Sequence, residues 1–424
     1  MACCSSLSTT DITSRSKRPQ IVRARAVLSY LAIRLKRMKT IESGKGPLHL
    51  QQVSMSQAVE LCCRFLSLDC LRLWFQATYL ERSPCPRPIR IALRPFCYGF
   101  DISCFLFMYT FWRGTHFLNN HFGYQLTFFR QGAFLKAKDL THPWSIRDIY
   151  LAHFTLTDVS ANQFWYAERL SRHGPGLAGA AQDGMYVWLL NWVAKMEGNR
   201  MKIEARHQGM ELTLNLLPRK PIVFHGKNGL SQKGPQEGQA SYYFSYTNLA
   251  TEGSIKTVLS RSTLSVKGTS WFDHEFGSNQ LSPDQVGWDW FSLHLSDGQE
   301  VMVYFLRKKD GSTEPSSSGT LVTRSGNAIH LKRSDINLEV LDYWKSPKSG
   351  GRYPSRWRVK ITSAKIELEL SALVPSQELL TEGSTGIIYW EGAVAGKGSS
   401  AGKAVTCEGY VELTGYAGSL GGIF

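Results

Sequence analysis

Residues from about 116 onward carry the hydrophobic pattern of β-strands. Short runs rich in Tyr, Phe, Val and Thr are separated by turn residues, and the 3.6-residue period of helices is scarce. The pattern predicts two sets of strands: Phe122–Arg130, Ile149–Thr157, Met201–Arg206 and Met210–Leu217, then Leu264–Lys267, Gly287–Leu295, Glu300–Leu306, Thr320–Thr323, Arg356–Ile361, Lys365–Leu370 and Val405–Leu413. Hairpin turns are expected at His207-Gln208-Gly209, Asp297-Gly298 and Asp310-Gly311.

Two sets of antiparallel strands indicate an all-β protein with two barrels or sandwiches side by side. We expect an N-terminal extension at 1–115, a first domain at 116–250 and a second at 251–424. Weak helical patterns predict short helices at Trp144–Ile149 and Ser376–Leu380. The segments 308–319 and 395–404 are rich in Gly, Ser and Lys and are expected to be mobile loops.

The basic charge of the chain is concentrated at its N-terminus. Residues 1–115 contain 17 Lys and Arg against 6 Asp and Glu, whereas the remainder contains 32 against 28. Nucleic acid is therefore not an expected partner of the main body. Eight of the nine cysteines lie in the first 104 residues, without the spacing of a zinc site.

The first 40 residues resemble an organellar transit peptide or an unrelated extension, because they hold nine Lys and Arg, one acid and many Ser and Thr. We expect residues 1–95 to be largely unpacked. They contain no secretory hydrophobic segment, and the apolar run at 99–112 is interrupted by Asp101 and too short to cross a bilayer. We therefore expect no transmembrane segment and leave the compartment and the oligomeric state open.

The densest chemistry lies in Trp271–Gly277 and Trp288–His294. If each segment is a strand, Trp271 and Asp273 share one face with Glu275, and Trp288 and Trp290 share one face with His294. A carboxyl group held among apolar rings has its charged form disfavoured and can stay protonated near neutral pH. Such a site suits an apolar ligand, although core strands with a surface-facing Asp would give the same pattern.

Other motifs carry less chemistry. Gly398-Ser399-Ser400-Ala401-Gly402 matches a hydrolase nucleophile elbow, but it joins two strands and is better interpreted as a hairpin tip. Asp273-His274-Glu275 lacks metal-ligand spacing, and alternation turns His274 away from its neighbours. No phosphate-cradling loop is present, so we expect neither a metal nor a cofactor.

Seven ordered segments carry a family resemblance. They are Gly123-Tyr124-Gln125-Leu126-Thr127-Phe128-Phe129-Arg130, Ala152-His153-Phe154-Thr155-Leu156-Thr157-Asp158, Gly176-Leu177-Ala178-Gly179-Ala180, Ala240-Ser241-Tyr242-Tyr243, Gly287-Trp288-Asp289-Trp290-Phe291, Tyr389-Trp390-Glu391-Gly392 and Gly409-Tyr410-Val411-Glu412-Leu413-Thr414-Gly415-Tyr416. The chain from about residue 122 resembles the AttH-like proteins, which are similar to the bacterial carotenoid 1,2-hydratases (hydroxyneurosporene synthases) and to lipocalin-fold pericyclases. The resemblance implies two lipocalin-like barrels with an apolar ligand cavity. Where the family carries a Glu-Trp-Trp-Tyr strand, this chain has Phe107–Trp112.

The resemblance implies two functions between which the sequence does not decide. As a hydratase or lyase acting on a polyene or terpenoid, the protein would use Asp273 as the acid, with His274 beside it, because Trp271-Phe272-Asp273-His274 matches the family's Tyr-His-Asp-His segment at those two positions. As a lipocalin-like carrier it would bind a hydrophobic small molecule without chemistry, and a pericyclase is a third possibility. The ligand-binding residues expected in each case are Trp271, Trp288, Trp290, His294, Tyr242 and Tyr243.

The acids Glu391 and Glu412 are expected on neighbouring strands. Their segments suggest buried, paired carboxyl groups, which together with Tyr416 would matter mainly for stability.

Overall fold

The computed structural model describes residues 102–112, 121–132, 142, 145–277 and 281–420. All of them belong to one compact unit, Ala92–Phe424. The expectations for residues 1–95 lie outside the described residues. Among the described residues, no helix has the length and apolar character needed to cross a bilayer.

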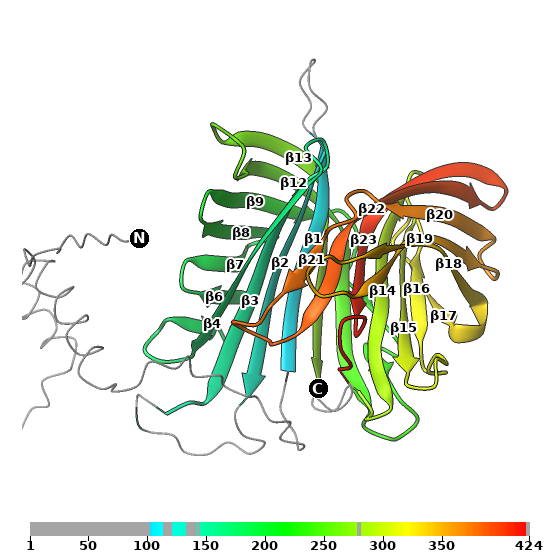
Figure 1. Cartoon of the computed structure of the whole chain (residues 1–424), viewed down its shortest axis with the longest axis horizontal. Helices are drawn as coiled ribbons and strands as arrows, with labels where there is room; N and C mark the ends of the chain where they lie inside the picture. The colour runs from blue at the N-terminus through cyan, green and yellow to red at the C-terminus, as the bar shows by residue number, and fades with distance from the viewer. Residues whose placement is uncertain (1–101, 113–120, 133–141, 143–144, 278–280, 421–424) are drawn as a thin grey trace, which may run out of the picture. The chain divides into compact units, whose positions relative to one another are not determined.

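The chain forms two antiparallel sheets (Figure 1). The first sheet contains β1 (Ile102–Trp112), β2 (His121–Gly132), β3 (Asp148–Asp158), β4 (Gln163–Arg172), β5 (Ala178–Ala180), β6 (Tyr186–Leu189), β7 (Trp192–Glu197), β8 (Arg200–His207), β9 (Met210–Pro218), β10 (Val223–Phe224), β11 (Leu230–Gln232), β12 (Ala240–Lys256) and β13 (Leu264–Gly277). The second contains β14 (Gln285–Leu295), β15 (Glu300–Lys308), β16 (Ser318–Val322), β17 (Ala328–Lys332), β18 (Ile336–Lys345), β19 (Arg352–Ile361), β20 (Ile366–Ala372), β21 (Glu378–Leu380), β22 (Ile388–Ser400) and β23 (Lys403–Thr414), with a 3-10 turn, η1 (Arg333–Asp335), between β17 and β18.

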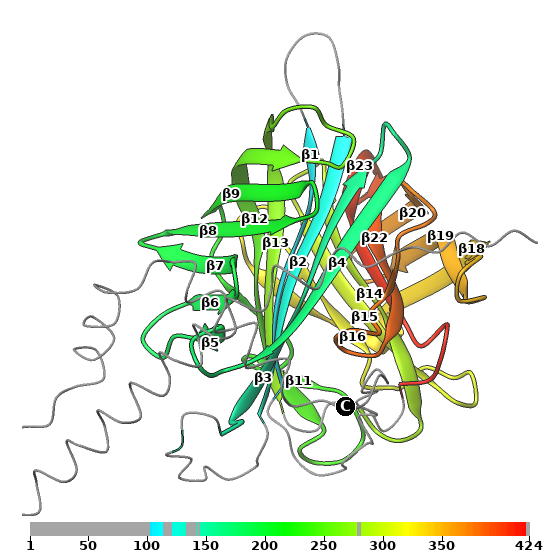
Figure 2. The ribbon, with the colours of Figure 1, turned by 60° about the vertical axis from the view of Figure 1, so that its left-hand side comes forward.

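The first sheet curls until its two edges approach each other. Its strand order is β4-β3-β2-β1-β13-β12-β9-β8-β7-β6-β5, and β4 contacts β5 and β6. Figure 2 shows β5–β9 stacked beside β12 and β13, with β2–β4 running steeply past them. The burial of β9 alternates residue by residue, which is the signature of a strand with one face on a core.

The second sheet is curled because a short turn joins its two edge strands. Its order runs from β17 through β16, β15, β14, β23, β22, β20 and β19 to β18. The edge strands β17 and β18 are consecutive in the chain and are joined only by η1. Because this three-residue turn cannot span a flat sheet, it holds the two edges near each other.

The described residues form three apolar clusters. One is enclosed by the first sheet and includes Phe154 and Leu214, and one is enclosed by the second and includes Phe291 and Trp357. The third contains residues of both sheets, among them Trp271 from β13, with the other members Tyr243, Leu281, Trp290, Met302, Tyr304, Leu306, Leu379, Ile387, Tyr389, Ala393, Tyr410 and Leu420. The strands β1 and β2 contact β23 and β22, so this third cluster packs one sheet against the other.

The all-β prediction with two curled antiparallel sheets is confirmed. The predicted hairpin at 207–209 is present, with Gln208 and Gly209 at positive φ. The change of sheet falls between Gly277 and Gln285, later than the boundary suggested at residue 250, because β12 and β13 form one long hairpin in the first sheet.

Three local expectations were wrong. The predicted helix at 376–380 is an extended segment that ends in β21, whose backbone bonds to β22. The described part of the predicted helix at 144–149, residues 145–149, enters β3 without a helical turn. The Gly-rich segment 395–404 is the turn end of the β22–β23 hairpin and not a loop outside the sheet. Glycine there lets neighbouring strands approach closely, because a Cβ on Gly398 would collide with the Glu367 carbonyl oxygen.

Candidate functional site

Several central strands are buried on both faces, and the two faces differ in chemistry. On β2, Leu126 and Phe128 point into the first core, whereas Gln125 and Thr127 are equally buried on the other face. On β22, Trp390 belongs to the second core, while Tyr389 belongs to the cluster between the sheets. The strands therefore bury a polar and aromatic layer between the two sheets.

Asp273 is held in this layer by three hydrogen-bond donors. Its Oδ1 accepts bonds from the Trp271 indole N–H at 2.7 Å and from the Ser245 hydroxyl, and its Oδ2 accepts the Tyr243 hydroxyl at 2.9 Å. Register explains part of this set, because Ser245 on β12 lies opposite Asp273 on β13. The Trp290 indole N–H, from the second sheet, donates to the Tyr243 hydroxyl at 3.0 Å.

The carboxyl group of Asp273 titrates close to neutral pH. Burial, which leaves the residue 5% exposed, raises its pKa, the three donors lower the pKa, and the charge of Glu275 raises it again; the result is a pKa of about 7. A carboxyl group with this pKa can carry a transferable proton at neutral pH and can also lose it. The surrounding aromatic rings supply the low-polarity environment that this balance requires.

A buried histidine lies behind Asp273. The His225 Nε2 is 2.6 Å from the Ser245 hydroxyl oxygen, and its Nδ1 is 2.8 Å from the Thr320 hydroxyl oxygen. Because Ser245 gives its only proton to Asp273, its oxygen must accept the His225 Nε2–H. Burial lowers the pKa of His225 to about 3, so the ring is neutral and Nδ1 accepts from Thr320.

Two further carboxyl groups lie close to Asp273. Glu412 on β23 accepts the Trp288 indole N–H at 2.8 Å, and burial together with the nearby charges of Glu275 and Asp273 raises its pKa to about 7 against the effect of that bond. Glu391 lies opposite Glu412 in the β22–β23 ladder. Burial, then the charges of Glu412 and Asp273, raise the pKa of Glu391 well above its usual range.

Glu391 has an incomplete set of hydrogen bonds. Its Oε2 accepts the Gln125 side-chain N–H at 2.5 Å, whereas its Oε1 has no hydrogen-bond partner among the described residues. The residue is 1% exposed. A buried acid whose Oε1 is left without a partner is suited to carry a proton rather than a charge.

Lys233 supplies a positive charge at the edge of this layer. Its ammonium group is 2.8 Å from Glu275 Oε1 and lies 4.1 Å from the Tyr304 ring centroid and 5.3 Å from that of Tyr243. Burial disfavours the charge of Lys233, but Glu275 and its other acidic neighbours together raise its pKa. The ammonium group therefore stays charged among aromatic faces.

The structure brings together most residues expected in the site. The Trp271 ring meets the Trp290 ring edge-on at 6.4 Å and the His294 ring at 5.6 Å, and Tyr243 bonds to Asp273. Trp288 reaches this layer by donating its indole N–H to Glu412. The His294 Nε2 donates to the Thr247 carbonyl at 2.6 Å, so this histidine ties the two sheets together.

Two predicted site residues lie elsewhere. Tyr242 is 56% exposed and stacks on Phe276 at 5.3 Å, because alternation along β12 turns it away from Tyr243. His274 packs against Phe244 at 5.0 Å, on the face of β13 opposite Asp273, and burial lowers its pKa to about 4. Neither one lines the layer around Asp273.

The sequence also missed members of the layer. Gln125 and His153 lie on the predicted strands Phe122–Arg130 and Ile149–Thr157 but were not expected in the site, and both are buried between the sheets. Glu391 and Glu412 lie on neighbouring strands, as the sequence predicted, but they were expected to matter for stability and not to lie near Asp273. The available signal was the recurrence of hydrogen-bonding residues at alternate positions of strands whose other positions are apolar.

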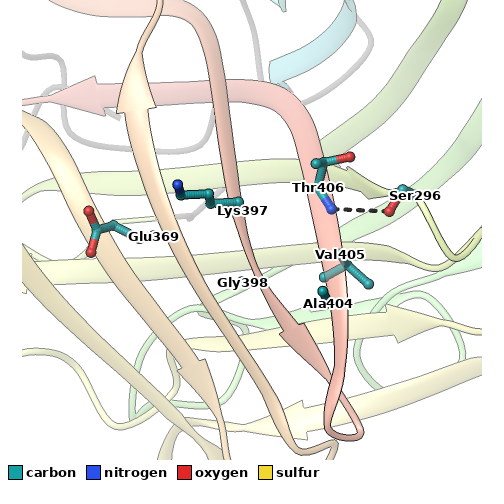
Figure 3. A pocket seen from close by; sticks show the side chains of 7 residues that line it. All are labelled: Ser296, Glu369, Lys397, Gly398, Ala404, Val405 and Thr406. Atoms are coloured by element: carbon teal, nitrogen blue, oxygen red, sulfur yellow. Dashed lines mark hydrogen bonds between the residues drawn. The ribbon is translucent and has the colours of Figure 1, made fainter.

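A separate depression of about 630 Å³ lies on the surface of the second sheet (Figure 3). It is lined by Ser296, Glu369, Lys397, Gly398, Ala404, Val405 and Thr406. The Thr406 backbone N–H donates to the Ser296 hydroxyl at 3.0 Å at its rim. This depression shares no residue with the layer around Asp273, and an apolar cavity at that layer stays a prediction.

No group of three or more His, Cys, Asp or Glu side chains in the described part of the chain is arranged to hold a metal ion. The buried carboxyl groups instead make hydrogen bonds to indole, hydroxyl and amide groups. The chemistry that this layer offers is proton transfer in an apolar environment.

Comparison with known proteins agrees with the fold. A family model described as AttH-like matches residues 111–416. The solved structure of an AttH protein from Nitrosomonas europaea is 30% identical, with a TM-score of 0.65, and the match covers 74% of this chain and 92% of that one. Kievitone hydratase from Nectria haematococca is 18% identical with a TM-score of 0.57, over 74% of this chain and 89% of that one, and shows the fold alone. A comparison with the curated proteins gave no match.

Proposed function

We propose that this chain, which belongs to the AttH-like family, is an enzyme that protonates a carbon–carbon double bond of a hydrophobic small molecule and directs the addition of water. The observation that carries the proposal is the Asp273 carboxyl group, with a pKa of about 7 and three hydrogen-bond donors among buried aromatic rings. Buried carboxyl groups whose pKa is strongly perturbed by desolvation and by specific neighbours are concentrated at functional sites.

The proposed reaction begins at Asp273. Its proton forms a C–H bond with one alkene carbon as the π bond breaks, and the other carbon becomes cationic. The rings of Trp271, Trp288 and Trp290 belong to the same aromatic cluster and are assigned to stabilise this cation, since each cation–π contact contributes on the order of 0.5–2 kcal/mol. The oxygen of a water molecule then bonds to the cationic carbon, and the proton that this water loses must pass to a neighbouring base.

The fold of kievitone hydratase, whose name describes a hydration, is compatible with this chemistry. At 18% identity it supplies a fold and no residue assignment. The substrate class is therefore argued from the layer itself. Its aromatic lining and its buried acids favour an apolar alkene, such as a polyene or terpenoid, over a charged metabolite.

The experiment compares Asp273→Asn with the unmodified protein on a panel of acyclic polyenes and terpenoid alkenes in isotopically labelled water. The amide keeps the shape and loses the transferable proton, so we expect labelled product to disappear while tryptophan quenching still reports binding. Asp289→Asn is the matched control, since the Asp289 carboxylate pairs with Arg307 at 2.9 Å and accepts the Tyr416 hydroxyl. Undiminished turnover in Asp273→Asn would overturn the proposal.

The second candidate is a carrier that binds the same class of molecule without chemistry. It is favoured by the dense packing of Trp271, Trp290 and Tyr243, because rigid aromatic walls are sufficient for binding. A carrier would bind members of the panel in both forms and release them unchanged.

A further inference from the structure

A second chain of hydrogen bonds runs from the layer between the sheets to the outside of the first sheet. Tyr389 on β22 bonds through its hydroxyl to His153 Nδ1 at 2.7 Å, and His153 Nε2 is 2.9 Å from the Ser384 hydroxyl oxygen. Ser384, between β21 and β22, donates to Glu168 Oε2 on β4. The Gly383 backbone N–H also donates to Glu168, at 3.0 Å.

The protons in this chain can all point one way. Ser384 gives its only proton to Glu168, so its oxygen must accept the His153 Nε2–H. Burial lowers the pKa of His153 to about 3, which leaves a neutral ring with one N–H. The His153 Nδ1 must then accept the Tyr389 hydroxyl proton, and the Tyr389 oxygen is left to accept the Gln125 N–H at 3.2 Å.

Each of the four groups can both accept and donate a proton. A phenol, an imidazole, a hydroxyl and a carboxylate can pass protons along such a chain without moving heavy atoms. His153 is 1% exposed and Tyr389 4%, whereas Glu168 is partly exposed. The chain therefore connects the buried layer with a carboxylate near solvent.

The inner end of the chain lies beside the acids of the proposed site. The Gln125 amide donates to both Tyr389 and Glu391, and Asp273 is close enough to Glu391 for its charge to raise the pKa of Glu391. Tyr389 and Trp271 belong to the same apolar cluster between the sheets. The Oε1 atoms of Gln125 and Glu391 have no hydrogen-bond partner among the described residues, so both can accept a hydrogen bond at the inner end of the chain.

We propose that Tyr389, His153, Ser384 and Glu168 form a proton wire, with Tyr389 as the base that receives the proton of the attacking water. This inference rests on the proposed function, and it identifies Tyr389 as the base that the hydration step requires. As the water oxygen bonds to carbon, its proton moves to the Tyr389 oxygen, the Tyr389 proton to His153 Nδ1, the Nε2 proton to Ser384, and the Ser384 proton to Glu168. After product leaves, the proton returns along the same chain and through water to Asp273, which restores every group.

The wire is tested without a substrate by nuclear magnetic resonance of the full chain labelled with ¹⁵N at histidine. We expect His153 to be the neutral Nε2–H tautomer. In Glu168→Gln, which keeps an acceptor but cannot take up a proton, exchange of this N–H with solvent should slow by roughly tenfold or more. His225 is the internal control, since its bonds to Ser245 and Thr320 do not involve Glu168.

Ser384→Ala provides a second break in the chain and should slow the same exchange. An Nδ1–H tautomer for His153, or unchanged exchange in both variants, would show that the wire is wrong whatever the activity of Asp273→Asn.

The catalytic role of Tyr389 is tested separately on any alkene of the panel that reacts. Tyr389→Phe should lower kcat by roughly 10²-fold with KM little changed, because only the transferable proton is removed. Loss of turnover in Asp273→Asn with full turnover in Tyr389→Phe would reject Tyr389 as the base and leave the proposed function standing. A correct tautomer and slowed exchange without turnover of any alkene would reject the proposed function and leave the wire.

Discussion

The Tyr243 hydroxyl donates a 2.9 Å hydrogen bond to Oδ2 of Asp273 and accepts the Trp290 indole N–H at 3.0 Å. One phenol thus joins an acid of the first sheet to an indole of the second. Its neighbour Tyr242 points to solvent and makes no such link.

Replacing Tyr243 with Phe should raise the pKa of Asp273 further. The Tyr243 hydrogen bond stabilises the charged carboxylate, so its loss favours the protonated acid. A hydrogen bond to a charged group contributes about 1.5–3 kcal/mol, which corresponds to about one to two pKa units. A carbon-13 titration of the Asp273 carboxyl group measures the change. Tyr242→Phe is the matched control and should leave the titration unchanged; an equal shift in both variants would contradict the assignment.

Replacing Glu412 with Gln should stabilise the protein at alkaline pH. The folded pKa of about 7 exceeds the ordinary 4.5, so the neutral acid is favoured by folding. Its contribution is complete below pH 4.5 and is lost as the pH rises through 7. The variant should therefore gain on the order of 1–3 kcal/mol over the unmodified protein between these limits.

Urea unfolding at pH 4.5 and pH 8 measures this difference. The buried histidines His153, His225, His274 and His294 act in the opposite sense but are common to both proteins and cancel. Glu369→Gln is the control, since Arg356 lowers the pKa of that exposed carboxylate. A gain for Glu412→Gln that is equal at both pH values would argue against a raised pKa.

Replacing Gly123 with Ala should loosen the packing between the sheets. A Cβ at this position would lie 2.6 Å from the Tyr410 hydroxyl oxygen and 3.0 Å from the Ala393 Cβ. Overpacking of this kind costs about 1–3 kcal/mol. Adding Tyr410→Phe removes the closest atom and should recover part of the loss, which a double-mutant cycle of unfolding free energies detects. Strictly additive losses would mean that the two residues do not meet.

Replacing Lys233 with Met should destabilise the protein by up to about 3 kcal/mol, because it leaves Glu275 without its cation. Adding Glu275→Gln should restore most of the loss. The surface pair of Lys360 and Glu367, 3.5 Å apart with both side chains about half exposed, is the control. Lys360→Met should cost less than about 1 kcal/mol. Thermal unfolding of the unmodified protein, Lys233→Met, the double variant with Glu275→Gln, and Lys360→Met measures these losses. Equal losses for Lys233→Met and Lys360→Met would contradict a buried ion pair.

The local sequence determined that the chain is built of antiparallel strands and which side chains of a strand share a face, although it missed strands such as β21. Period-two alternation is a property of a single strand, so the common face of Trp271 and Asp273 and the opposite face of His274 could be inferred without a partner. The same rule turns Tyr242 away from Tyr243. Grouping both tyrosines in one site overlooked that rule and relied on their position between the two strand sets.

Only the tertiary structure decided what covers the polar faces. Gln125, His153 and Glu391 occupy positions next to buried apolar residues of the opposite strand face, and a single sheet would leave such positions in water. Packing the second sheet against the first buries them, raises the pKa of Glu391 and lowers that of His153. Residues separated by more than 200 positions, such as His153 and Tyr389, then meet within a hydrogen bond. Periodicity carries no information about which face of one sheet meets which face of another, because that choice depends on the summed packing of both.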